Sequence, residues 1–222
     1  MKLVNAVHGL EIDFKEGTPE VLILENEISF RNIAGEIWKQ CNGENGDFVL
    51  SDGKILKLDK HMVVISNPFD LDFQNRKVTS ALYAKMSQIG SEKVAEKSLL
   101  NTQMINLIEN ITDSINYTGI TFQLDFDWND LFKMYSVKIE APDNFLIRMI
   151  EFIKVMTCLC GISLFCFYNL KSYLSEDELL LFYKEADYNK VSLLLIESFE
   201  SKQMDVEHIT IIDKDLCVIK KI

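Results

Sequence analysis

Few residues in this chain of 222 interrupt regular secondary structure, since it contains only three prolines and nine glycines. This scarcity predicts long helices and strands and argues against a disordered tail. Hydrophobic residues make up 48% of the chain and charged residues 26%, the balance of an ordinary folded protein. The length is sufficient for one large domain, or a domain with an appendage, around a substantial hydrophobic core.

Long apolar runs are also missing. No uncharged apolar run approaches the roughly 18 residues that a membrane helix needs, and charges begin almost at once, unlike in a signal peptide. The five cysteines are odd in number and three lie inside apolar runs, which favours free buried thiols in a reducing compartment. We therefore expect a cytoplasmic protein without a membrane partner.

Catalytic motifs are absent from the sequence. His8, His61 and His208 fall in a turn and at two strand starts, with no recognisable partner motif. The sequence has no Gly-x-Ser-x-Gly nucleophile elbow and no His-Glu-x-x-His zinc motif. The segment between Gly43 and Gly53 comes nearest to a phosphate loop, but it lacks the Gly-Lys-Ser/Thr ending. We predict no catalytic residues and a protein that is not an enzyme.

The stretch from Val21 to Lys39 organises the predicted core. Its four apolar residues 21–24 have the length and branching of a buried strand, and isoleucines then recur at helical spacing. A tight strand-to-helix turn is where many α/β proteins bind nucleotide phosphate through glycine N–H groups and a lysine. Because this turn reads Glu25-Asn26-Glu27, its geometry suggests a nucleotide site but its chemistry argues against one.

The order of elements predicts an α/β fold with a mostly parallel sheet, assembled from both ends of the chain. We assign 1–75 and 141–222 to this discontinuous core, in which a hairpin occupies residues 1–18. The further buried strands are predicted at 62–66, 162–168, 191–196 and 208–212.

Residues 76–140 form an inserted helical projection in this interpretation. One apolar stripe ends at Gly90, and a second helix opens at Ser91 and runs to about residue 116. Alternating apolar residues in 120–126 predict a strand with acidic residues at its end. The projection either folds on itself as a hairpin or contacts another subunit.

The acidic residues of the projection are candidate metal ligands. Carboxylate oxygens are the hard ligands that calcium prefers, and the set consists of Asp125, Asp127, Asp130 and Glu140. They do not match the helix–loop–helix calcium motif. The alternative is a solvated acidic edge, in which Asp127 or Asn129 caps a short helix.

The net charge of −11 means that a uniform surface would repel nucleic acid, so DNA binding has to rest on a local cluster of basic residues. A ribbon of two short strands, 48–50 and 55–58, carries three lysines. We predict phosphate contacts, which position DNA without reading its sequence, from Arg31, Lys39, Lys54, Lys57, Lys60, Arg76, Lys77 and Lys85. The alternative is that lysines on short exposed strands keep sheet edges soluble.

Several segments, each unspecific alone, together resemble one family by their order and spacing. They are Val21-Leu-Ile-Leu-Glu-Asn before a helix, the Asp52-Gly-Lys ribbon, Met62-Val-Val-Ile followed by Asn67-Pro-Phe-Asp, Leu124-Asp-Phe-Asp, Val137-Lys-Ile-Glu, Ser163-Leu-Phe-Cys-Phe-Tyr-Asn, Tyr173-Leu-Ser-Glu-Asp-Glu and Leu193-Leu-Leu-Ile-Glu-Ser. Over nearly its whole length, the chain is similar to the Csn family of type II-A CRISPR systems, in its short form. That form is an accessory adaptation protein and not a nuclease.

The resemblance implies a non-enzymatic protein that acts when new spacers are acquired. It implies a core like a degenerate P-loop NTPase without its phosphate loop, and a homotetrameric ring that holds double-stranded DNA and prefers free ends. Calcium at acidic sites, the integrase pair and the effector nuclease of the same locus are the implied cofactor and partners. By position, Asp125 and Asp127 fall in the family's acidic stretch, and Lys54 falls in its basic ribbon.

Two other functions stay open at this point. One is a divergent P-loop-type nucleotide hydrolase, against which the acidic turn after residue 24 argues. The other is a structural adaptor that binds only protein partners through its long helices.

Overall fold

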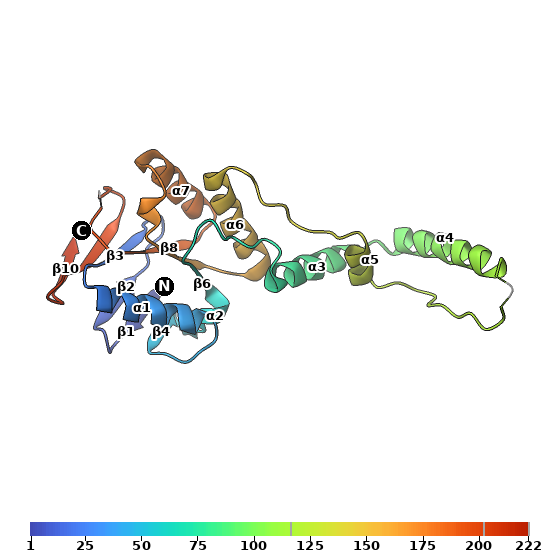
Figure 1. The fold of residues 1–222 in the computed structure, drawn as a ribbon, viewed down its shortest axis with the longest axis horizontal. Helices are drawn as coiled ribbons and strands as arrows, with labels where there is room; N and C mark the ends of the chain where they lie inside the picture. Colours follow the sequence, from blue (N-terminus) through green and yellow to red (C-terminus); the bar gives the residue numbers. More distant parts are fainter. Residues whose placement is uncertain (116, 202, 222) are drawn as a thin grey trace. The chain divides into compact units, whose positions relative to one another are not determined.

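The computed structural model describes residues 1–115, 117–201 and 203–221 (Figure 1). The chain divides into two compact units. The core unit comprises Met1–Phe73 and Ala141–Ile222, and the helical unit comprises Gln74–Glu140. None of the helices among the described residues has the length and apolar character needed to cross a membrane.

The core unit is built on a six-stranded sheet with the strand order β10-β9-β3-β8-β7-β6. All neighbouring strands are parallel except β10 and β9, which confirms the predicted α/β fold with a mostly parallel sheet. The strands are β3 (Glu20–Leu24), β6 (Met62–Ile65), β7 (Leu164–Tyr168), β8 (Ser192–Glu197), β9 (His208–Ile212) and β10 (Val218–Lys221). Every residue of β3 is buried, as expected for a central parallel strand covered on both faces.

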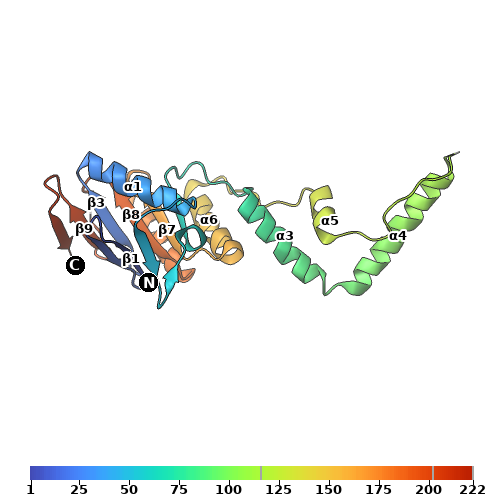
Figure 2. The same ribbon diagram turned by 90° about the horizontal axis from the view of Figure 1, so that it is seen from below.

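Helices cover both faces of this sheet (Figures 1 and 2). Helix α1 (Glu27–Cys41) lies on one face, and α6 (Phe145–Cys160) and α7 (Glu176–Tyr188) lie on the other. Local signals set their ends, because Ser175 and Glu178 form the predicted capping box of α7 and Gly161 ends α6 in the left-handed region at φ 68°.

A second, four-stranded antiparallel sheet packs on the α1 side of the core unit, and side chains from both sheets and α1 form one hydrophobic cluster. Its order β2-β1-β4-β5 joins β1 (Lys2–Asn5), β2 (Leu10–Asp13), β4 (Phe48–Ser51) and β5 (Ile55–Leu56). The predicted strand 55–58 of the ribbon is too long, because the observed strand β5 ends at Leu56. The chain turns after Leu56 into the short helix α2 (Leu58–His61), so Lys60 lies on a helix and Lys57 precedes it.

The helical unit contains α3 (Arg76–Gly90), α4 (Val94–Asp113) and α5 (Trp128–Met134). Helix α3 packs against α5, where the backbone of Gly90 meets the Trp128 ring so closely that a β-carbon would lie 2.8 Å from it. Ser91 does not cap α4, which begins three residues later, at Val94.

The strand predicted at 120–126 is wrong, since the described residues of this segment contain none, and residues 137–140 contain none either. A strand needs a neighbouring strand to complete its hydrogen bonds, and the described residues of this unit form only helices and irregular segments. Instead, the Leu124 carbonyl accepts a bond from Asn101 Nδ2 of α4 at 2.7 Å, and the Val137 carbonyl accepts one from the Tyr83 hydroxyl of α3 at 3.1 Å.

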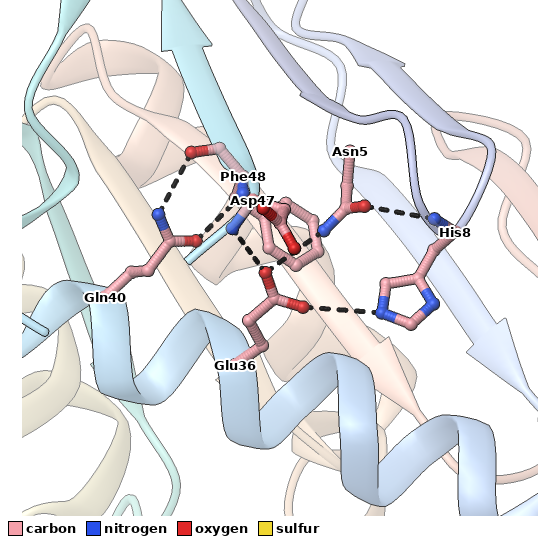
Figure 3. Close-up of polar contacts among 6 residues, drawn as sticks. All are labelled: Asn5, His8, Glu36, Gln40, Asp47 and Phe48. Carbon is pink, nitrogen blue, oxygen red and sulfur yellow. Dashed lines mark hydrogen bonds and ion pairs between the residues drawn. The ribbon is translucent and has the colours of Figure 1, made fainter. Parts of the chain in front are cut away.

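A polar network fastens α1 to the second sheet (Figure 3). Glu36 of α1 accepts hydrogen bonds from the buried Asn5 side chain at 3.3 Å and from the Asp47 N–H at 2.6 Å. Its other oxygen lies 3.3 Å from His8 Nε2. One turn further, the Gln40 amide both donates to the Phe48 carbonyl and accepts from the Phe48 N–H, at 3.1 and 3.0 Å. These bonds set how the second sheet packs on the core.

We predict that Glu36→Ala lowers the free energy of unfolding by about 2–3 kcal/mol, because it leaves the buried Asn5 amide without its acceptor. Urea unfolding followed by circular dichroism measures the loss. Glu44→Ala, an exposed site in the following turn, serves as the control and should change stability by less than about 0.5 kcal/mol. Equal effects of the two substitutions would contradict a structural role for this network.

Candidate functional site

The turn after β3 has the position of a nucleotide site but is closed to phosphate. Only Glu25 and Asn26 separate β3 from α1. The Asn26 side-chain oxygen accepts bonds from the N–H groups of Ile28 and Ser29, both at 3.1 Å, and so occupies the helix N-terminus that would bind an anion. Glu27 adds a negative charge in the first turn. The residues present therefore do not fit a bound phosphate group.

All eight basic residues predicted to contact DNA are exposed. Lys54, Lys57 and Lys60 lie within one short connection between β4 and β6, and Lys60 forms an ion pair with Asp59 at 3.3 Å. The other two core-unit residues, Arg31 and Lys39, lie on α1. Arg76, Lys77 and Lys85 belong to α3 of the helical unit. Phosphate contact by these residues stays a prediction.

The four predicted metal ligands do not converge on one point in the helical unit. Asp125 pairs with Lys97 and Asp130 with Lys133, both at 3.1 Å. Glu140 lies 3.8 Å from Lys138. Asp127 caps α5 by accepting the Asn129 N–H at 2.7 Å, which is the helix-capping alternative weighed above. In the part of the chain that the structure describes, no three His, Cys, Asp or Glu side chains are grouped so that they could hold a metal ion.

A buried ionic cluster at the carboxyl end of β8 was not predicted. Glu207 accepts bonds from the Lys171 ammonium at 2.7 Å, the Tyr183 hydroxyl at 2.7 Å and the Met204 N–H at 3.2 Å. Burial first and the Glu207 carboxylate second raise the pKa of Tyr183 above its ordinary value. Glu197 ends β8 beside this group and is fully buried.

The sequence gives a single hint of this cluster, because an acid follows directly on the apolar run of β8. Lys171, on the turn after β7, lies 26 residues from Glu197 and 36 residues from Glu207, which is on the segment before β9. Sequence spacing alone does not bring them together.

We predict that Lys171→Met lowers the free energy of unfolding by about 3–5 kcal/mol, since Glu207 would remain buried without its cation. Lys184→Met changes an exposed lysine of α7 and provides the matched control, with an expected change below about 0.5 kcal/mol. Urea unfolding of both variants measures the change in the free energy of unfolding. A Lys171 variant as stable as the Lys184 variant would show that the buried pair contributes nothing.

The chain was compared with known families and proteins. A family model described as CRISPR-associated protein (Cas_Csn2) matches residues 40–216. No curated protein matches the chain. A solved structure described as a putative ABC transporter (ATP-binding protein) from Pyrococcus furiosus is 11% identical, covers 90% of this chain and 88% of its own, and has a TM-score of 0.37. A TM-score and a sequence identity this low support no conclusion about fold or function.

Proposed function

The chain belongs to the Csn2 family of CRISPR-associated proteins, and on this basis we propose that it is a non-enzymatic DNA-binding protein of spacer acquisition. It binds double-stranded DNA without reading its sequence, prefers free ends, and does so as a homotetrameric ring. The family match over residues 40–216 is the observation that carries this proposal. Its partners are the integrase pair and the effector nuclease of the same locus, in the cytoplasm.

The closed turn after β3 supports a function without nucleotide hydrolysis. A phosphate group needs free N–H donors or a cation at that position, and Asn26 and Glu27 supply neither. The divergent nucleotide hydrolase is therefore the weaker alternative.

The exposed apolar side chains of α4 support assembly. None of the 20 residues of this helix is buried, and Leu99, Leu107 and Ile111 are 64%, 61% and 55% exposed. Apolar residues that recur along a helix without cover mark an interaction surface. A second copy of the chain offers the same surface, as a symmetric contact requires.

Assembly also explains how an acidic chain binds DNA. A ring brings the same basic residues of each subunit around one central hole, so a few lysines per chain become a dense positive lining. Lys54 and Lys57 are exposed and are the basic residues of the β4–β6 connection outside the Lys60–Asp59 ion pair.

We propose calcium as a cofactor of the assembled protein. Because the four predicted carboxylate ligands each bind a local partner, they do not form a calcium site within one chain. A site that uses them draws its ligands from more than one copy of the chain or from a rearranged segment. No step of DNA binding is assigned to the ion.

We predict that the double variant Lys54→Glu and Lys57→Glu weakens binding to linear duplex DNA about tenfold or more at low salt, equally for all sequences. Fewer phosphate contacts also reduce the slope of affinity against salt. Fluorescence anisotropy measures both quantities. Lys15→Glu with Lys184→Glu adds the same charge at exposed sites elsewhere on the core unit and is the matched control.

Two outcomes would count against this assignment. Equal affinities of the two double variants would remove the β4–β6 connection from the DNA contact. Absence of binding by the unaltered protein at low salt with calcium present would favour the adaptor that binds only proteins.

If the exposed apolar side chains of α4 form the contact between subunits, the double variant Leu107→Glu and Ile111→Glu should convert the tetramer to a smaller species, because it places charge in an apolar contact. Size-exclusion chromatography with light scattering, with and without calcium, reports the mass. Leu181→Glu, at an exposed apolar site of α7, should leave the mass unchanged. A tetramer that survives both α4 substitutions would show that its contacts lie elsewhere.

A further inference from the structure

The carboxyl group of Glu197 is a fully buried titratable group of the core unit. It lies at the carboxyl end of the central strand β8 and is 0% exposed. One oxygen accepts the Lys171 N–H at 3.2 Å. The other is buried and finds no hydrogen-bond partner among the described residues. A buried carboxylate normally receives two or more donors, so this site is poorly equipped for a negative charge.

The nearby cation, the Lys171 ammonium, bonds directly to Glu207 and acts on Glu197 through its charge. The Lys171 ammonium lies 2.7 Å from Glu207, whose carboxylate is also fully buried. Glu207 receives two more donors, from Tyr183 on α7 and from the Met204 N–H. Among the described residues, the two buried carboxyl groups therefore share the Lys171 ammonium, and Glu207 accepts more hydrogen bonds than Glu197. With both acids ionised, the cluster would hold an uncompensated buried charge.

The surroundings of Glu197 favour the neutral form of its carboxyl group over the ionised form. The pKa of Glu197 is raised to about 7, chiefly by burial and in smaller part by the Glu207 carboxylate. The N–H groups of Lys171 and Leu170 and the Lys171 charge oppose this. Tyr183 faces the far oxygen of Glu207, while Asn169 bonds to Ser198 and carries no titrating group.

We propose that Glu197 is a proton-dependent latch. Its neutral form holds the turn η1 (Leu170–Ser172) and the anchor, by which we mean Glu207 bonded to Lys171, against the end of β8. Ionisation of Glu197 loosens both. The turn η1 is attached through the Lys171 N–H, and the anchor is attached through the Lys171 ammonium. An ionised Glu197 regains water only when η1 moves away from the end of β8, and η1 carries Lys171 with its bond to Glu207, so the cost of burying the charge acts on both attachments. The latch is independent of DNA binding and of assembly.

The sign of the pH dependence follows from the raised pKa. An unfolded or opened Glu197 titrates at its ordinary value near 4.5, whereas the closed form titrates near 7. Between these values the closed form holds a proton that the open form has lost. The closed form is therefore favoured fully below about 4.5, loses stability as the pH rises to about 7, and changes no further above that.

Amide hydrogen exchange tests the latch at two reporters, the Lys171 N–H and the Met204 N–H. After correction for intrinsic exchange, their protection should fall up to about tenfold per pH unit between pH 5 and 7 and level off above 7. Glu197→Gln keeps the shape of the neutral acid and should remove this slope. Glu44→Gln, at an exposed turn, should retain it. The same slope in both variants, or no slope in the unaltered protein, overturns the proposal.

A second measurement does not depend on the folding of any variant. Carbon-detected NMR of the glutamate side chains should contain one carboxyl resonance with a midpoint near pH 7. If every glutamate of the folded protein titrates below about pH 5.5, Glu197 is not held neutral and the latch does not exist.

Discussion

The parallel pairing of β3 with β8 and β9 is the constraint on which the rest of this structure depends. β3 comes from the beginning of the chain and its two neighbours from the end, and residues 20–23 pair with β8 while residues 20–24 pair with β9. Parallel neighbours require long crossover connections, so the chain has to leave the sheet and return before the core can close. The helical unit occupies part of such a connection, between β6 and β7.

This arrangement brings together the carboxyl ends of the neighbouring strands β3 and β8, which carry two different groups of polar side chains. At the end of β3, Asn26 satisfies the first N–H groups of α1 and leaves no place for phosphate. At the end of β8, Glu197 is fully buried, and Glu207 forms an ion pair with Lys171. At these two strand ends, on the edge where α/β enzymes commonly bind ligands, the protein's own side chains occupy the space. The basic β4–β6 connection and the uncovered α4 are the surfaces for which we propose a function.

Sequence reasoning predicted those parts of the fold that local chemistry determines. Continuous apolar runs such as 21–24 gave the buried parallel strands, and Ser175 with Glu178 gave the start of α7, because both signals lie within a few residues. The strand predicted from the alternation of 120–126 was wrong, since a strand depends on a partner strand and the described part of the helical unit contains none. The short helix that carries Lys60 was missed for a related reason, as pairing ends after Leu56. The Glu197 cluster depends on contacts between distant segments, which one sequence does not reveal.

The central claim is that the assembled protein holds duplex DNA as a ring. Its most direct test compares binding to a linear duplex with binding to a covalently closed circle of the same sequence, at low salt and with calcium. A closed ring that loads over free ends should bind the linear molecule and lose it when both ends are blocked by bulky groups, and it should bind the circle weakly. Equal binding to both molecules would contradict loading at ends, and binding to neither would contradict the claim itself.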